Sequence, residues 1–150
     1  MDMKKMTQPD QLDRFAFLWS QARLIIAAIA LFLGGVPVLR FVVRTPSLFS
    51  AVGQVLTITW ILTGVASAYL LYRFMKAGQT VFGGKNQRDL AAFAVSVASG
   101  INLGLVGLLG RNIGMSILSG RIVFLVAGVV YLAAAWQLQM RYMARGNKLF

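Results

Sequence analysis

The sequence of 150 residues contains no cysteine, no histidine and no glutamate, and its only acids are four aspartates. Without these three residue types, the common zinc and transition-metal sites lose their main ligands. General acid–base catalysis loses its most frequent residues, and thiol chemistry is excluded. We therefore expect no enzymatic activity, no metal ion and no cofactor.

Negative charge is scarce, since 15 Lys and Arg residues give the chain a net charge of +11. A charge of this size is typical of nucleic-acid-binding proteins. However, 58% of the residues are hydrophobic and the mean hydropathy is +0.71, which is too apolar for a soluble domain of this length. The basic residues lie between long apolar runs, as they do at the flanks of membrane spans. We therefore predict a membrane protein with no nucleic-acid partner.

Four apolar stretches are long enough to form transmembrane helices, which need about 20 residues to cross about 30 Å of hydrocarbon. Gly34, Gly35 and Pro37 predict a kink or an early end in the first of these spans. Arg23 and Arg40 lie near its two ends, where each side chain can extend to the nearer interface. The sequence predicts one all-α domain over residues 1–150, a bundle of four transmembrane helices. The four spans are predicted at about 24–43, 48–72, 90–109 and 122–140.

The segment 7–22, before the first predicted span, has the pattern of an amphipathic helix. Leu12, Phe15, Trp19 and Ala22 recur at spacings that place them on one apolar stripe. Such a helix either lies in the cytoplasmic interface or extends the first span into water. We expect the stripe to pack on the bundle, with binding to the membrane surface or to a partner as the alternative.

The basic residues are distributed unequally between the two sides of the predicted bundle. One side carries Lys4, Lys5, Arg14, Arg23, Arg73, Lys76, Lys85, Arg88, Arg141, Arg145 and Lys148. The other carries Arg40, Arg44, Arg111 and Arg121. Because cytoplasmic loops hold the excess of positive charge, both termini are predicted in the cytoplasm. The basic loops would then contact anionic lipid headgroups. Tyr72, Tyr142 and Trp19 would lie near that interface, in an aromatic belt. We expect a multi-pass protein of the cell membrane, of the bacterial inner-membrane type.

The third span carries a strip of small residues at spacings of three and four. In lipid, close approach of helix backbones through small residues is a main source of helix association. The strip is therefore predicted to face another helix. That helix belongs either to the same bundle or to another subunit, and the wall of a narrow pore is a further alternative. The strip consists of Ala92, Ser96, Gly100, Gly104 and Gly107.

A few polar residues inside or beside the spans form a candidate polar pathway. Asn102 lies deep in the third span, where an unpaired amide costs a few kcal/mol. It is expected either to join two helices or to line a wet site. Thr57 and Ser67, in the second span, can bond to carbonyls one turn back in their own helix. Arg111 follows the third span and completes the candidate set.

Two functions are compatible with these features. The first is a non-catalytic membrane protein that works through helix–helix association, as a homo-oligomer or as the small subunit of a membrane complex. The second is a channel or carrier for a small anionic or neutral solute, since no acid lies inside the spans and arginines lie at their ends.

Overall fold

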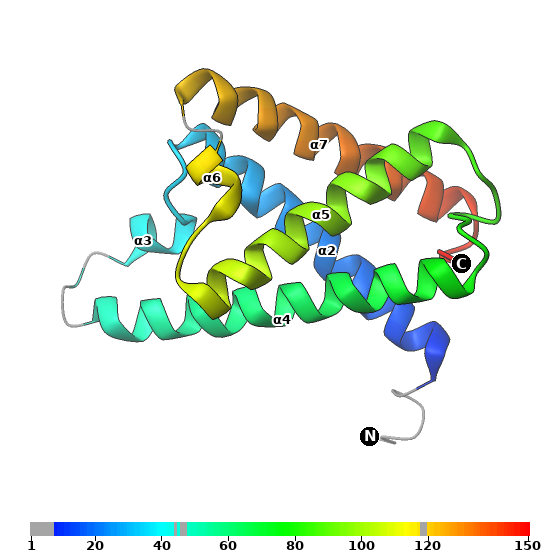
Figure 1. Cartoon of the computed structure of the whole chain (residues 1–150), viewed down its shortest axis with the longest axis horizontal. Helices are drawn as coiled ribbons and strands as arrows, with labels where there is room; N and C mark the ends of the chain where they lie inside the picture. The colour runs from blue at the N-terminus through cyan, green and yellow to red at the C-terminus, as the bar shows by residue number, and fades with distance from the viewer. Residues whose placement is uncertain (1–7, 44, 46–47, 118–119) are drawn as a thin grey trace.

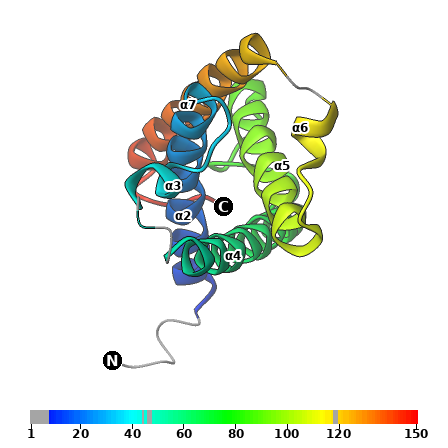
Figure 2. The same ribbon diagram turned by 90° about the vertical axis from the view of Figure 1, so that its left-hand side faces the viewer.

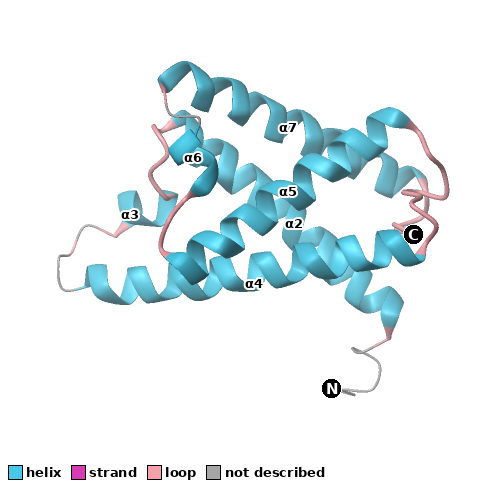
Figure 3. Cartoon of the chain, in the orientation of Figure 1, coloured by secondary structure: helices cyan, strands magenta, loops and turns pink. Residues whose placement is uncertain are grey.

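The computed structural model describes residues 8–43, 45, 48–117 and 120–150. This part of the chain is almost entirely helical (Figure 3), and only an isolated bridge between Val81 and Gly84 has β geometry. Figure 1 shows the helices in chain order: α2 (Pro9–Phe32), α3 (Val38–Val42), α4 (Phe49–Lys76), α5 (Gln87–Leu109), α6 (Ile113–Ile117) and α7 (Arg121–Ala144).

The four long helices α2, α4, α5 and α7 are each long and apolar enough to cross a membrane. The predicted all-α fold with four such helices is therefore confirmed. α4 packs most extensively on α5, and α2 on α7. Figure 2 looks along the bundle and shows the four helices arranged around a central region.

The first helix begins and ends earlier than predicted. α2 runs without a break from Pro9 to Phe32, so the predicted bounds 24–43 are wrong, and the described residues of segment 7–22 belong to the same helix. It ends because Gly34 and Gly35 have φ angles of +85° and +84°, which lie outside the helical region and suit glycine. The other three spans differ from their predicted bounds by a few residues at their ends.

Two residues of the apolar stripe that was predicted to pack on the bundle, Leu12 and Phe15, face outward instead. Leu12 and Phe15 are 39% and 51% exposed, whereas Asp13, Phe17 and Ser20 are buried. A bilayer explains the inversion, because lipid tails are as apolar as leucine and exert no hydrophobic force toward the bundle. Polar groups then gain most by facing the protein interior.

The predicted strip of small residues on α5 faces α4. A Cβ atom added to Gly104 would lie 2.5 Å from the Cα of Gly64, and one added to Gly107 would lie 3.0 Å from the carbonyl oxygen of Thr57. Ala92, Ser96 and Gly100 of the strip are buried as well. The backbones of α4 and α5 are therefore in direct contact, and α4 of the same chain covers this part of the strip.

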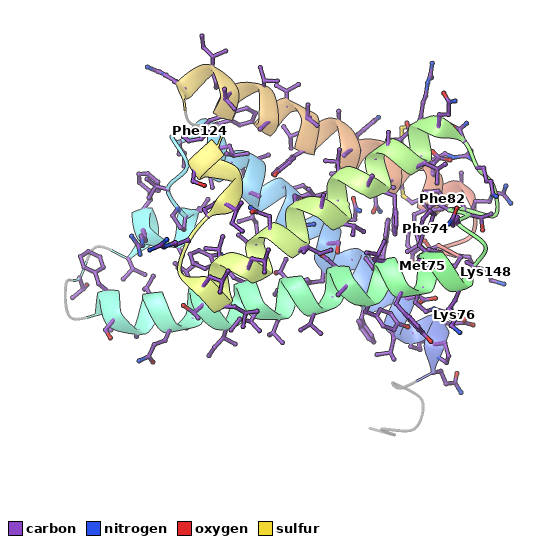
Figure 4. All side chains as sticks on the ribbon, in the orientation of Figure 1. Phe74, Met75, Lys76, Phe82, Phe124 and Lys148 are labelled. Atoms are coloured by element: carbon purple, nitrogen blue, oxygen red, sulfur yellow. The ribbon has the colours of Figure 1, made fainter. Side chains whose placement is uncertain are left out.

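The end at which α2 and α5 begin and α4 and α7 end is tightly packed, and we call it the closed end. The rings of Phe17 and Tyr142 lie 4.3 Å apart, and those of Phe17 and Phe82 lie 6.4 Å apart. Figure 4 labels Phe74 and Phe82 in this aromatic cluster. The amide of Phe82 also donates to the carbonyl of Leu149 at 2.7 Å, so the last residues help to seal this end.

Two ion pairs also join helices at the closed end. Asp13 of α2 accepts two hydrogen bonds from the Nε and Nη2 atoms of Arg73 of α4, and its Oδ2 lies 2.6 Å from Nη2. Asp89 of α5 is fully buried and accepts from Nε of Arg141 and Nε2 of Gln137, both on α7. α2 is thus tied to α4, and α5 to α7. We call the opposite end, near α3 and α6, the open end.

Candidate functional site

A cavity of about 730 Å³ lies between the long helices on the side of the open end. All four long helices and α3 contribute to its wall. Figure 2 views the molecule from this end. The polar and aromatic residues of the wall are Trp19, Arg23, Arg40, Thr59, Trp60, Thr63, Ser99, Asn102, Asn112 and Tyr131.

Arg23 is the most unusual residue of the cavity wall, because its charge lies inside the bundle. The side chain is only 7% exposed. Its Nη1 donates to Oγ of Ser99 at 2.7 Å, and its Nη2 donates to the carbonyl oxygen of Ser96. Ser99 is the thirteenth of 23 residues in α5, so the guanidinium lies about half-way along this helix. The expectation that Arg23 extends to an interface is therefore wrong.

The site has an excess of positive charge. Within the described ranges, no ion pair joins Arg23 to a carboxylate, and its Nε has no hydrogen-bond partner. Asp13 and Asp89 are both engaged at the closed end. Arg40 of α3 adds a second cation to the wall. A buried charge without a partner is costly, and an anion in the cavity would offset that cost.

Aromatic and hydroxyl groups line the same cavity as Arg23. Nε1 of Trp19 donates to Oγ1 of Thr63 at 3.0 Å, and that hydroxyl donates to the carbonyl of Thr59 at 2.8 Å. Trp19 thus lines the cavity at the middle of α4, and Tyr142 is buried in the closed end. The predicted aromatic belt is therefore wrong for Trp19, whereas the depth of Tyr72 and Tyr142 in the membrane stays a prediction.

A layer of buried polar groups without hydrogen-bond partners among the described residues lies next to the cavity, about one helical turn toward the closed end. Ser20 and Gln21 lie three and two residues before Arg23, and Ser67 follows Thr63 by four residues. Among the described residues, the hydroxyls of Ser20 and Ser67 and both amide atoms of Gln21 are buried without a hydrogen-bond partner. Buried polar groups are usually satisfied, so this layer can interact with a polar solute or with water.

The structure brings only Asn102 of the candidate polar pathway to the cavity. Its Nδ2 donates to Oδ1 of Asn112 at 3.1 Å, and its Oδ1 accepts from the amide of Gly114 at 3.2 Å. Asn102 therefore attaches the connection between α5 and α6 to α5, and does so within the wall of the cavity.

The other three members of that pathway lie outside the cavity. The hydroxyl of Thr57 donates to the carbonyl of Gly53 at 3.0 Å, as predicted. Ser67 makes no such bond among the described residues, so that prediction is wrong, and its hydroxyl lies against Gly100 of α5. Arg111 is exposed between α5 and α6.

The sequence-based reasoning missed Arg23, Trp19, Thr63 and Ser99 as a group. Part of the signal was present, because residues 15–18 are Phe, Ala, Phe and Leu, an apolar run that precedes Arg23. A span placed further toward the N-terminus would have put Arg23 near its middle, where an ionisable residue indicates a functional site.

Comparisons with protein-family models, with curated proteins and with solved structures find no match to this chain.

Proposed function

We propose that this protein is a non-catalytic membrane carrier or channel that binds a small anionic or neutral solute in the cavity at Arg23. The observation that carries the proposal is the buried guanidinium of Arg23, which has no carboxylate partner among the described residues. Charged residues inside membrane spans mark ion and substrate paths. A wall with one sign of charge raises the local concentration of the opposite ion.

The two ends of the bundle support a transport role. The cavity lies toward the open end, and the layer of Ser20, Gln21 and Ser67 continues from it toward the closed end. The aromatic cluster and the two ion pairs then block the route. A path that is accessible from one side and blocked at the other is the arrangement expected of a carrier in one of its two states.

For the orientation, we propose that the closed end faces the cytoplasm of a bacterial-type cell. Among the described residues, and with Arg23 inside the bundle, eight basic residues lie on the closed-end side against three on the other, and the excess indicates the cytoplasm. These residues would contact anionic headgroups. Because the chain has no cysteine, single cysteines at Lys85 and Arg111 test this without background. A membrane-impermeant maleimide added to intact cells should label only the second position.

Flux into liposomes tests the proposed function. The purified chain is reconstituted and tested with chloride, nitrate, phosphate and acetate, and with urea and glycerol as uncharged solutes. For a transported anion, Arg23→Gln should lower the flux about tenfold, since a hydrogen bond to a charged group is lost. Arg111→Gln is the matched control, because that residue is exposed and outside the cavity. Flux equal to that of empty liposomes for every solute would contradict the proposal.

Helix association with a second copy or with a membrane partner is a second proposal. Because α4 of the same chain covers the strip on α5, a second copy or a partner would have to bind a different helix face, one that points away from the bundle. Trp136 on α7 is 70% exposed, and tryptophan is enriched in binding hot spots. Native mass measurement in mild detergent should show an oligomer or a bound partner that Trp136→Ala weakens. A monomer that is unchanged by this substitution would contradict association through α7.

A further inference from the structure

A second hollow lies on the outer side of the bundle, between α5 and α7. This groove has a volume of about 460 Å³. Its wall is almost wholly apolar and includes Val95 and Ala98 of α5 and Val126 and Val130 of α7. Val126 and Val130 are exposed on the outside of the molecule, where a transmembrane bundle meets lipid. The groove is therefore accessible from the lipid phase.

The groove and the cavity share part of their walls. Ser99 of α5 and Tyr131 of α7 line both. Ser99 is also the residue whose hydroxyl accepts from Nη1 of Arg23. The inner edge of an apolar groove thus meets the one buried cation that lacks a carboxylate partner among the described residues.

We propose that the ligand is a single-chain amphiphile with an oxyanion headgroup, either a carboxylate or a phosphate. The headgroup binds Arg23 beside Ser99, and the hydrocarbon tail lies in the groove between α5 and α7. The ligand enters sideways from the bilayer through this groove. The inference rests on the proposed function in placing an anion at Arg23, and it adds the tail and the route.

Charge complementarity selects this occupant over an ordinary bilayer lipid tail. An uncharged chain would fill the groove but leave the guanidinium unpaired, and a free anion would pair with Arg23 but leave the groove to lipid. A guanidinium matches the geometry of a carboxylate or a phosphate with paired hydrogen bonds. Only a tailed anion uses both surfaces at once.

The test measures binding to the full chain in nanodiscs of zwitterionic lipid. Dodecanoate and dodecyl phosphate are the tailed anions, acetate and inorganic phosphate the untailed ones, and dodecanol the uncharged chain. The tailed anions should bind, and dodecanol should bind at least about tenfold more weakly. Arg23→Gln should weaken the tailed anions by about the same factor.

Substitutions at two alanines of α5 test the binding of the tail separately from the binding of the headgroup. Ala98 lines the groove but not the cavity, whereas Ala94, also exposed and one turn away, lines neither. Ala98→Phe should weaken the tailed anions about tenfold and leave Arg23-dependent binding of untailed anions unchanged. Ala94→Phe should change neither.

The outcomes distinguish this inference from the proposed function. If untailed anions bind through Arg23 but Ala98→Phe has no effect on tailed ones, the inference is overturned and the proposed function stands. If tailed chains bind independently of Arg23, or dodecanol binds as well as dodecanoate, the groove holds bilayer lipid only and the inference is overturned. If no anion binds through Arg23, the inference is overturned together with the anionic form of the proposed function, and only flux of urea or glycerol would keep its neutral form.

Discussion

The closed end and the open end of this bundle use arginine in opposite ways. At the closed end, Arg73 and Arg141 each pair with an aspartate of another helix. At the open end, Arg23 is more deeply buried than either, yet within the described part of the chain its hydrogen bonds go to a serine hydroxyl and a carbonyl oxygen and not to a carboxylate. The comparison teaches that the first two charges join helices to one another, whereas the third is the one on which the proposed binding site depends.

The small residues between α4 and α5 hold together two helices that run from the closed end to the open end. Their substitution should therefore lower the free energy of unfolding more than any other change. Gly104→Leu would force side-chain atoms into the backbone of Gly64. We expect a loss of more than about 3 kcal/mol in the free energy of unfolding, because the backbone contact cannot relax locally. Gly53→Leu on α4 is the control, since a Cβ there meets no atom within 4 Å. Unfolding in mixed micelles measures both, and equal stability of the two variants would show that the contact is not essential.

Removing a charge at the closed end should destabilise the protein. Arg141→Leu leaves the carboxylate of Asp89 buried, with Gln137 as its remaining partner. We expect a loss of about 2 kcal/mol, below the range for a fully buried pair because Arg141 is partly exposed. Arg88→Leu, at an exposed position of α5 next to Asp89, should cost little. Thermal unfolding in the same detergent checks the pair, and comparable losses would argue that Asp89 needs no cation.

Removing the charge at the open end should not destabilise the protein. Arg23→Met keeps most of the side-chain volume and eliminates a buried cation that lacks a carboxylate partner among the described residues. We expect the free energy of unfolding to stay the same or rise by about 1 kcal/mol. Anion binding should fall about tenfold. A loss of stability similar to that of Arg141→Leu would show that Arg23 is structural and would remove the contrast between the ends.

The smallest effect is expected at the α5–α6 connection. Asn102→Leu removes the acceptor of the Gly114 amide and the donor to Asn112. We expect a local loss of about 1 kcal/mol, seen as faster hydrogen exchange at Gly114 with little change at the closed end. Gln54→Leu, an exposed position of α4, serves as the control. Unchanged exchange at Gly114 would mean that other contacts hold α6 in place.

The number and type of the long helices could be predicted from the sequence because they depend on local composition. A run of about twenty apolar residues bounded by arginine and glycine identifies a membrane span, regardless of which other helices pack against it. The spacing of the small residues on α5 was likewise enough to predict that Gly104 contacts another helix. Which helix it contacts was not readable, because that depends on the packing of α4 against α5.

The cavity could not be predicted because it depends on which face of α2 points inward. An apolar stripe is a reliable guide to the interior only in water, and the stripe of Leu12 and Phe15 faces outward here. Taking residues 7–22 as a separate segment also moved Arg23 from the middle of a helix to its end. The predicted start of the first span at residue 24 therefore hid the site around Arg23.

The placement of the three tryptophans gives the protein an internal optical probe. Trp19 and Trp60 line the cavity, whereas Trp136 lies on the outward face of α7. Their indole emission is sensitive to polarity, so Trp136→Phe leaves a protein whose fluorescence comes only from the cavity wall. Occupancy of the cavity can then be followed in real time without attaching any dye.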